Sequence, residues 1–374
     1  MLSPVPDGVT VVASHEKAEK IVERGKPAPL LILEPLEEYL EAHGFGTGPL
    51  EWDRLGLQSR SGTFHLKRED GTEIILKRRL SGDQPPGLIS IESEVELLGI
   101  LRRHHLHSPE VVHVCKDKTI IGDSFYLTHF LPGEAVIHSV PKNLDTVEEK
   151  VSMSRRAIDD LARIQVEITP EEVAKFDRGG GELRRLVLES KRMARKLKMR
   201  RIPGFEILGD YLLENAPEVR PLVISHGRYS FQNLLFLPNA PATISGIFGW
   251  ERATASDPLM DLGYFTATYA YKDLPETPLD TTPVTREVDG FLSRDELANV
   301  FRIATHMDTK DLPWYQTYCL WHEAVQLEEI YERLMNNEAV PNKAFALSLR
   351  EGVPQILANA AHFSRVEGVE AILR

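Results

Sequence analysis

The residues whose types are best suited to chemistry gather in two stretches, 223–233 (VISHGRYSFQN) and 244–262 (ISGIFGWERATASDPLMDL). The first stretch holds Arg228, which cannot accept a proton because the pKa of a guanidinium lies above about 12. A guanidinium can instead grip a phosphate or a carboxylate through two parallel hydrogen bonds. It can equally fold onto a nearby carboxylate, and Glu251 and Asp257 are the partners expected for such an internal ion pair. The sequence leaves both alternatives open.

Three further side chains are candidates for acid–base chemistry. Tyr229 directly follows Arg228 and could present its phenol to the site, although an aromatic residue there can equally serve packing. His322 and Glu323 are neighbours in a helical stretch, and a neutral histidine beside an acidic group can act as a general base. Because adjacent helical residues point about 100° apart, we expect only one of this pair to face the site.

The amino-acid composition is that of a soluble globular protein, and it argues against some classes of binding partner. The chain has 374 residues, 42% of them hydrophobic and 27% charged, which suits one large two-lobed domain with a buried core. The net charge of −12 argues against general binding to nucleic acid or to anionic membranes. Two cysteines provide no disulfide framework and no CxxC pair, and the histidines lack a metal-ligand spacing, so no metal ligand is assigned. Without a membrane-length apolar stretch or a secretory signal, we expect a cytoplasmic protein.

The secondary structure predicted for the first part of the chain changes from helix to short strands and back to helix. Residues 1–28 are predicted to form an N-terminal extension, and residues 34–43 an amphipathic helix. Short strands are predicted between residues 50 and 80, where Asp70-Gly71 is a hairpin signal. Residues 89–105 then have the apolar spacing of a helix, and further strands follow it.

From about residue 145 the pattern is mainly helical. Apolar residues recur at helical spacing in residues 147–168 and again in the long stretch 314–337, with short strands between them. Residues 184–201 contain nine lysines and arginines. We interpret this basic stretch as a solvated helix face, and binding of an anionic ligand or partner is the alternative.

In this order and spacing, the segments resemble the aminoglycoside-phosphotransferase-like family. The resemblance is strongest to the branch found as stand-alone bacterial phosphotransferases and as domains fused to acyl-CoA dehydrogenases. It runs from about residue 29 to residue 337 and rests on five ordered segments: residues 59–78, 92–104, 120–134, 223–233 and 244–265. It implies an α+β fold with two protein-kinase-like lobes, a small mixed sheet lobe over residues 29–133 and a larger, mainly helical lobe over residues 134–374.

The family pattern His-Gly-Asp-x-x-x-x-Asn, with a second Asp on a following strand, provides the catalytic base and the magnesium ligands. The resemblance places Arg228 at the first Asp and Gly249 at the second, and it keeps Asn233 as the magnesium-binding Asn. These two changes raise the formal charge at the site by three. They remove the proton acceptor and a metal ligand, which argues against ordinary Mg-ATP phosphotransfer.

Other roles follow from the same resemblance. Residues 58–63 would form the loop above the nucleotide phosphates, Lys77 the strand lysine that contacts them, and Glu94 its helix partner. Residues 128–131 would be the hinge that holds adenine. The acceptor pocket also departs from the pattern, because His322 stands where the family often has an arginine.

Bracing of the catalytic loop is a further implied role. His226 is interpreted as a brace that acts through hydrogen bonds, and Asp257 and Asp261 as the structural DPxxD segment that supports the same loop.

Three functions remain open. The preferred one is a kinase-fold protein that has lost phosphotransfer and uses its pocket for a small, anionic organic ligand, with acid–base chemistry such as cyclisation or isomerisation. The second is a non-catalytic pseudokinase that binds a metabolite or a protein partner. The third is an atypical phosphotransferase in which Glu251 and Asn233 form an abnormal metal site; only this function would require ATP and Mg²⁺. The oligomeric state is left open.

Overall fold

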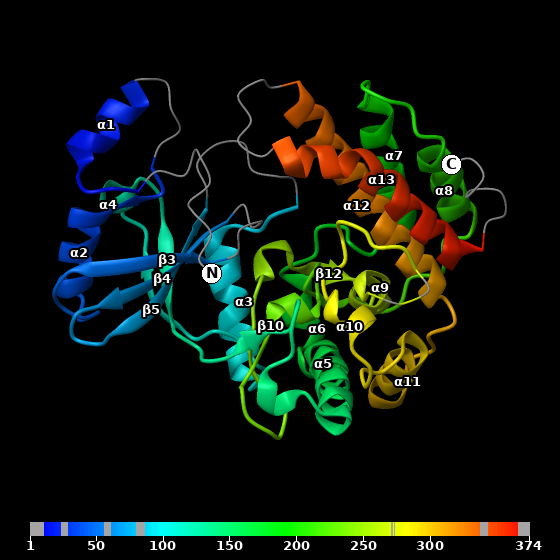
Figure 1. Ribbon diagram of the computed structural model, residues 1–374, viewed down its shortest axis with the longest axis horizontal. Helices are drawn as coiled ribbons and strands as arrows, with labels where there is room; N and C mark the ends of the chain where they lie inside the picture. Colours follow the sequence, from blue (N-terminus) through cyan, green and yellow to red (C-terminus); the bar gives the residue numbers. More distant parts are fainter. Residues whose placement is uncertain are drawn as a thin grey trace. The chain divides into compact units, whose positions relative to one another are not determined.

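A computed structural model describes residues 11–23, 29–55, 61–79, 87–270, 272, 274–336 and 343–365. The chain divides into two compact units (Figure 1). The first, here called the sheet unit, comprises residues 1–103 and 108–131, and the second, the helical unit, comprises residues 104–107 and 132–374.

The sheet unit is built on a five-stranded antiparallel sheet in the order β3-β4-β5-β7-β6. Its strands are β3 (Leu50–Leu55), β4 (Ser61–Arg68), β5 (Glu73–Arg79), β6 (Val111–Cys115) and β7 (Phe125–His129). The predicted hairpin joins β4 to β5. Its turn is closed by Asp70, whose carboxylate accepts the N–H of Thr72 at 2.9 Å, and by Gly71 at a φ of 87° that favours glycine.

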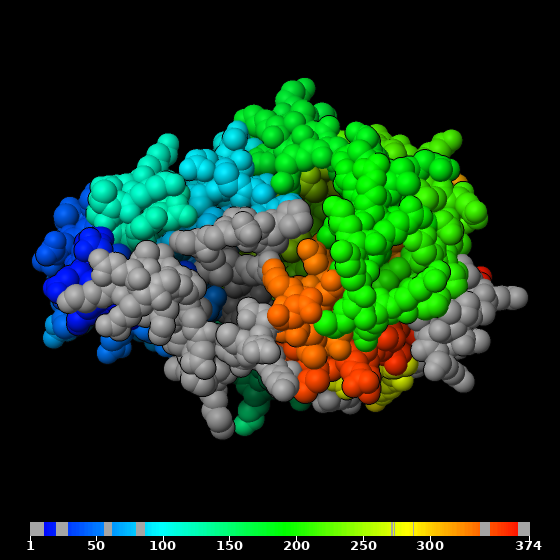
Figure 2. Space-filling view, turned by 90° about the horizontal axis from the view of Figure 1, so that it is seen from above, coloured from blue at the N-terminus to red at the C-terminus, as the bar shows by residue number. Residues whose placement is uncertain are grey.

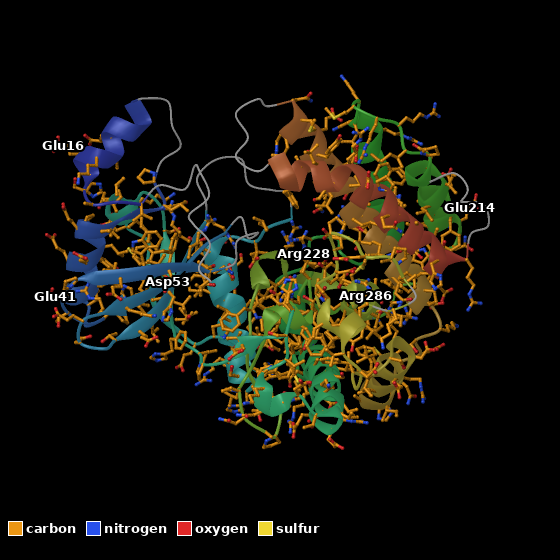
Figure 3. All side chains as sticks on the ribbon, in the orientation of Figure 1. Glu16, Glu41, Asp53, Glu214, Arg228 and Arg286 are labelled. Carbon is orange, nitrogen blue, oxygen red and sulfur yellow. The ribbon has the colours of Figure 1, made fainter. Side chains whose placement is uncertain are left out.

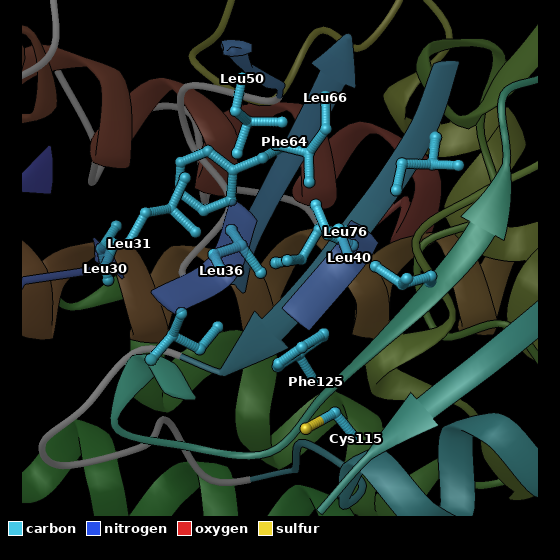
Figure 4. Packing of buried hydrophobic residues seen from close by; sticks show 13 residues of the cluster. Leu30, Leu31, Leu36, Leu40, Leu50, Phe64, Leu66, Leu76, Cys115 and Phe125 are labelled. Carbon is cyan, nitrogen blue, oxygen red and sulfur yellow. The ribbon is translucent and has the colours of Figure 1, made fainter. Parts of the chain in front are cut away.

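One face of this sheet carries the core of the unit. Phe64 and Leu66 of β4 and Leu76 of β5 point to the same side, because side chains alternate along a strand. They pack with leucines of the first helices, including Leu36 and Leu40 (Figure 4). Residues in the alternate positions of β5 therefore point to the opposite face of the sheet.

The helices and remaining strands of the sheet unit flank this core. They are β1 (Val11–Val12), α1 (His15–Glu23), β2 (Leu31–Ile32), α2 (Leu33–Ala42), α3 (Ile91–Arg103) and α4 (Lys118–Ile121). β1 pairs in parallel with β2, so the described part of the predicted N-terminal extension belongs to this unit. The helices predicted at residues 34–43 and 89–105 are confirmed as α2 and α3. Residues 56–60 lie outside the described residues, and they include residues 58–60 of the predicted phosphate loop.

The helical unit is organised around α12, which packs against α7, α8, α9 and α13. Its helices are α5 (Val147–Glu167), α6 (Pro170–Ala174), α7 (Leu183–Lys196), α8 (Gly204–Glu214), α9 (Leu259–Thr268), α10 (Val284–Glu287), α11 (Arg294–Thr305), α12 (Leu312–Met335) and α13 (Lys343–Ser364). The green segment of α7 and α8 and the orange segment of α12 lie side by side on one face of this unit (Figure 2).

Short strands and single 3₁₀ turns place the candidate loops within this helical unit. They are β8 (Glu134–Ala135), η1 (Lys142–Leu144), β9 (Val223–Ser225), η2 (Phe231–Asn233), β10 (Leu234–Phe236), β11 (Ile244–Ile247), η3 (Trp250–Arg252) and β12 (Thr254–Ser256). β10 pairs with β8 and β11, and β9 pairs with β12, all antiparallel. One loop thus lies between β9 and β10, and η3 lies between β11 and β12.

The predicted fold class is confirmed: a sheet lobe and a larger helical lobe. The two cysteines are buried. Among the described residues, no helix has both the length and the apolar character needed to span a bilayer.

The basic stretch of α7 is largely matched by acidic side chains. Arg185 pairs with Glu189 at 2.6 Å, and Lys191 pairs with Asp210 of α8. Arg195 bonds Glu206 of α8 at 2.8 Å. These local pairs account for several of its charges without any anionic ligand.

Candidate functional site

The loop after β9 is held by a buried carboxylate at the start of α9. Asp261 accepts the backbone N–H of His226 at 2.6 Å and that of Gly227 at 2.9 Å. Burial raises the pKa of Asp261, and these hydrogen bonds act against that rise. Gly227 has a φ of 84°, and a Cβ there would lie 2.8 Å from the carbonyl oxygen of Arg252. The loop conformation therefore requires glycine, and the predicted bracing by Asp261 is present.

His226 completes this brace as a neutral imidazole. Its Nε2–H donates to the carbonyl oxygen of Phe248 at 2.6 Å, and its Nδ1 accepts the backbone N–H of Arg228 at 3.2 Å. One ring nitrogen donates and the other accepts, which is the pattern of a single neutral tautomer. The ring is buried and ties the β9–β10 loop to the segment before η3.

Arg228, labelled in Figure 3, occupies the middle of the loop. It pairs with a residue far away in the sequence. Its Nε and Nη2 donate to the two carboxylate oxygens of Glu323 on α12, at 3.1 and 2.6 Å. The sequence suggested Glu251 or Asp257 for this pair. Asp257 instead binds Arg220, and Glu251 lies near enough to act on Arg228 electrostatically.

The ion pair holds both of its members in their charged forms. Burial acts to lower the pKa of Arg228, but Glu323, Tyr264 and Glu251 together outweigh it, so the pKa is raised above its ordinary value. Burial acts to raise the pKa of Glu323, but the charges of Arg228 and Arg252 bring it below its ordinary value. A carboxylate held in this way is a weak base, which counts against the acid–base role predicted for Glu323.

Asn233 keeps its place at the end of the loop while its expected partner is missing. Its Nδ2 donates to the carbonyl oxygen of Arg228 at 2.9 Å. A Cβ added to Gly249 would lie 3.1 Å from the Oδ1 of Asn233. A side chain at position 249 would therefore extend beside this amide oxygen, and glycine supplies no ligand atom there.

Two residues that sequence reasoning missed complete the surroundings of Arg228. Arg252 ends η3, and Tyr264 lies on α9 one turn after Asp261. Both act electrostatically on Arg228 and Glu323. A signal for each was present in the sequence: Arg252 directly follows the Trp-Glu pair of the motif, and Tyr264 is at i+3 from Asp261 on the same helix face.

Tyr229 must be reassigned from the site to the core. Its side chain is fully buried, and its hydroxyl donates to the carbonyl oxygen of Ala157 on α5 at 2.6 Å. It also packs near Phe265. The phenol therefore does not face the site, which corrects its predicted catalytic role.

His322 takes part in a chain of hydrogen bonds that uses both of its ring nitrogens. Its Nε2 accepts from the amide of Gln326 at 2.7 Å, and its Nδ1–H donates to the hydroxyl of Ser190 at 2.8 Å. Ser190 in turn donates to Leu186. Burial lowers the pKa of His322, with Glu323 acting in the opposite direction, so the ring is neutral near pH 7. Both ring nitrogens are engaged, so the structure does not leave His322 poised as a general base.

In the sheet unit, the predicted lysine and glutamate meet. Lys77 donates to Glu94 Oε1 at 2.5 Å, and the hydroxyl of Tyr126 donates to the same oxygen at 3.0 Å. Arg79, two residues after Lys77 on the same face of β5, donates to Glu94 Oε2 at 2.8 Å. Sequence reasoning did not include Arg79, so the cluster carries one more cation than expected.

The candidate residues thus form two separate groups. Lys77 and Glu94 lie in the sheet unit, and the others lie in the helical unit. Within the helical unit, Arg228 and Glu323 are in contact, and Asn233 is bonded to the backbone of Arg228.

Comparison with known proteins shows the family of this chain. A model of the phosphotransferase enzyme family matches residues 54–297. The chain belongs to this family. Acyl-CoA dehydrogenase family member 10 of Mus musculus is 27% identical over 240 residues, which are 63% of this chain and 22% of that protein. Acyl-CoA dehydrogenase family member 11 of Homo sapiens is 24% identical over 274 residues, 71% of this chain and 34% of that protein. The chain thus spans about a third or less of these two relatives.

Solved structures of the family share the fold. A candidate aminoglycoside phosphotransferase from Ralstonia eutropha JMP134 superposes with a TM-score of 0.71 at 20% identity, covering 89% of this chain and 98% of that one. Spectinomycin phosphotransferase, solved in complex with ADP and spectinomycin, superposes with a TM-score of 0.60 at 11% identity, covering 90% and 99%. At these identities the likeness shows the fold alone.

The residues present do not fit the magnesium ion that the family fold implies. A divalent cation would meet the guanidinium of Arg228 where the family has a carboxylate, and Asn233 would have no carboxylate partner at Gly249. Within the described part of the chain, no cluster of three or more histidine, cysteine, aspartate or glutamate side chains has the arrangement of a metal site.

Proposed function

We propose that this chain does not transfer phosphate from Mg-ATP and instead holds a small organic ligand in its helical unit. The observation that carries this proposal is the ion pair at the position of the catalytic base, where Arg228 donates to both carboxylate oxygens of Glu323. A phosphotransferase needs a residue there that orients and deprotonates the acceptor hydroxyl, and a guanidinium cannot do so.

Electrostatics oppose the metal as well. A guanidinium roughly 5 Å from a divalent ion raises the energy of that ion by on the order of several kcal/mol at an effective dielectric near 20. The position of Gly249 offers no ligand atom to offset this cost. Glu251 is the remaining carboxylate of the motif that could bind a cation, and an abnormal metal site on Glu251 and Asn233 is the alternative that ligand titration must exclude.

The state of the acid–base candidates supports binding ahead of catalysis. Glu323 is held as a carboxylate by Arg228, and His322 has both ring nitrogens engaged by Gln326 and Ser190. Acid–base chemistry on the ligand would require one of these bonds to break first. We therefore propose ligand binding as the primary function, and cyclisation or isomerisation of the ligand as the secondary one.

A second candidate function is metal-independent binding of a nucleotide by the sheet unit. Lys77 and Arg79 both donate to the carboxylate of Glu94, so two cationic side chains lie beside each other on β5. A polyphosphate could accept charge-assisted hydrogen bonds from such side chains without a metal. Lys77→Gln should abolish such binding, whereas it should leave a ligand of the helical unit unaffected.

Thermal unfolding of the full chain tests these functions together. ATP, ADP and coenzyme A are each added with and without Mg²⁺, followed by a set of small organic acids. A ligand at a hundred times its dissociation constant should stabilise the fold by about 2.7 kcal/mol, a visible shift. We expect no magnesium-dependent stabilisation by ATP. Magnesium-dependent stabilisation by ATP, followed by phosphate transfer to an acceptor, would overturn the proposal.

A further inference from the structure

We propose that the outer face of α7 and the segment after it bind a membrane surface that contains anionic lipids. This face belongs to the helical unit, and its role is independent of the site around Arg228. Its basis is a set of exposed cations that form no ion pair in the described part of the chain, with exposed apolar side chains among them.

The two sides of α7 differ in burial. Ser190 bonds His322 of α12 and Lys191 bonds Asp210 of α8, so one side of the helix is packed. The buried residues on this side are Leu183, Val187, Ser190 and Lys191. Successive helical residues are turned by about 100°, so residues 184, 188, 192 and 196 lie on the other side of the helix. This outer side is exposed at all four positions: Arg184, Leu188, Arg192 and Lys196.

Five exposed cations form what we call the basic stripe: Arg184, Arg192, Lys196, Lys198 and Arg201. The first three lie on the outer side of α7, and the last two follow the end of the helix. Their side chains form no hydrogen bond or ion pair with any residue that the structure describes. The structure therefore gives these five charges no internal role.

The other four cations of residues 184–201 each bond a carboxylate: Arg185, Lys191, Arg195 and Arg200. Six carboxylates of the described chain bond this stretch: Glu182, Glu189, Glu206, Asp210, Glu328 and Glu332. Because the stretch contains nine lysines and arginines, an excess of three positive charges remains. The excess is carried by the basic stripe, on the solvent side of the helix.

Two large apolar side chains are exposed within the basic stripe. Leu188 lies between Arg184 and Arg192 on the outer side of α7 and is 42% exposed, and Met199 follows Lys198 and is 38% exposed. Cations that contact anionic headgroups, with apolar side chains that enter the interface between them, are typical of proteins that lie on a membrane surface. The basic stripe has both components.

This composition favours a lipid surface over other polyanions. Proteins that bind single-stranded nucleic acid use aromatic side chains on which the bases stack, and residues 184–201 contain none. An acidic protein segment would have to match the spacing of the stripe. A fluid lipid surface can bring an anionic headgroup to each cation, and it also takes up Leu188 and Met199.

The net charge of −12, which argues against binding to anionic membranes, belongs to the chain as a whole. At about 0.1 M salt, exposed charges more than about 10 Å apart are largely screened from one another. The 14 residues of α7 span about 21 Å. The local excess of positive charge therefore determines the attraction at this face, and the acidic residues elsewhere contribute little to it.

Co-sedimentation of the full chain with vesicles tests the proposal. Vesicles of phosphatidylcholine alone are compared with vesicles that hold about 30% phosphatidylserine, at about 0.1 M and about 0.5 M NaCl. At the lower salt concentration we expect the protein to bind the anionic vesicles at least about tenfold more strongly than the neutral ones, and to dissociate at the higher one. No binding to anionic vesicles, equal binding to both, or binding that salt does not weaken would overturn the proposal.

Charge variants assign the contact to the basic stripe. The triple variant Arg184→Gln, Arg192→Gln and Lys196→Gln should weaken vesicle binding by about 100-fold, about fivefold for each cation. Circular dichroism shows that the variant is folded before its affinity is interpreted.

A matched control removes two arginines and one lysine from exposed positions elsewhere in the helical unit: Lys142→Gln, Arg155→Gln and Arg156→Gln. It makes the same change in net charge, and we expect it to leave vesicle binding unchanged. Unaltered binding in the α7 variant, or an equal loss in the control, would overturn the assignment.

A mixed-sequence single-stranded oligonucleotide distinguishes a lipid surface from a nucleic acid. At equal concentrations of phosphate groups, the protein should bind the oligonucleotide more weakly than the anionic vesicles, and inorganic phosphate at matched ionic strength should not displace it from them. Leu188→Gln should weaken vesicle binding by about threefold to tenfold, because it removes apolar surface that enters the interface. Tighter binding of the oligonucleotide, displacement by phosphate, or unchanged vesicle binding in Leu188→Gln would overturn the choice of a membrane as the partner.

Discussion

The sheet unit and the helical unit differ in how they match the site that the family resemblance leads us to expect. In the sheet unit, Lys77 and Glu94 retain both their identities and their ion pair at 2.5 Å. In the helical unit, Asp261 and Asn233 bond the backbone of the loop. Arg228 and Gly249 stand where the resemblance leads us to expect the two carboxylates. The hydrogen bonds that support the loop are therefore independent of the chemistry of its side chains. They join backbone groups, and any side chain at position 228 leaves these groups in place.

The largest expected effect lies in the sheet unit. Glu94→Gln removes the carboxylate that Lys77 and Arg79 both bond, and these two side chains are each 10% exposed. Removing one partner of such a buried pair should cost about 3–5 kcal/mol in the free energy of unfolding. Urea denaturation measures it, with the exposed Glu92→Gln of the same helix as the control. A loss of unfolding free energy below about 1 kcal/mol would show that the cluster around Glu94 stabilises the protein less than the Arg228–Glu323 pair does.

The corresponding change in the helical unit should cost less. Glu323→Gln breaks the bond to Arg228, which keeps a 36% exposed side chain and can be hydrated, so we expect a loss of about 2 kcal/mol. Exposed Glu329→Gln on α12 is the control. The double variant with Arg228→Met should recover part of the loss. Additive effects of the two single changes would mean that the pair contributes no coupling energy.

A substitution at position 249 distinguishes the cost of a left-handed backbone conformation from the cost of a steric contact. Gly249 has a φ of 88°, and a Cβ added there would lie 3.1 Å from Asn233, whereas Gly71 has a φ of 87° and a Cβ there would meet nothing within 4 Å. Gly71→Ala should therefore cost about 1–2 kcal/mol for the left-handed conformation alone. Gly249→Ala should cost more by the contact with Asn233. Equal losses in urea denaturation would show that Asn233 moves aside freely.

The smallest effect is a pH dependence. Burial lowers the pKa of His322 below its ordinary value of 6.5, so below about pH 6.5 the unfolded chain binds a proton that the folded chain does not. Stability should therefore fall as the pH drops from 7, until the folded-state pKa is reached. His322→Gln should flatten this part of the stability curve, and exposed His43→Gln should leave it unchanged. An unaltered slope in His322→Gln would assign the dependence to another group.

Local patterns predicted most of the fold because they depend on nearby residues. The Asp70-Gly71 hairpin and helices α2 and α3 follow from turn chemistry and apolar spacing. The bracing role of Asp261 followed from the motif that contains it. These features need no knowledge of distant contacts.

The partner of Arg228 could not be predicted in this way. Glu323 is 95 residues away, and the two nearby carboxylates looked equally suitable. Tyr229 was misassigned because a loop tyrosine beside a charged residue gives no sign of whether its ring enters the core. Arg252 was missed because its electrostatic effect on Arg228 and Glu323 joins residues that are distant in the sequence, which only the packed structure reveals.

Restoring the carboxylates tests the loss of the metal site most directly. Isothermal titration of Mg-ATP compares the wild type with the variant Arg228→Asp, Gly249→Asp and Glu323→Gln, where the last change avoids two facing carboxylates. We predict that ATP binding depends on Mg²⁺ in the variant and does not in the wild type. A wild type that binds ATP more tightly with Mg²⁺ would contradict the claim that its metal site is lost. A folded variant that ignores Mg²⁺ would contradict the claim that these two positions account for the loss.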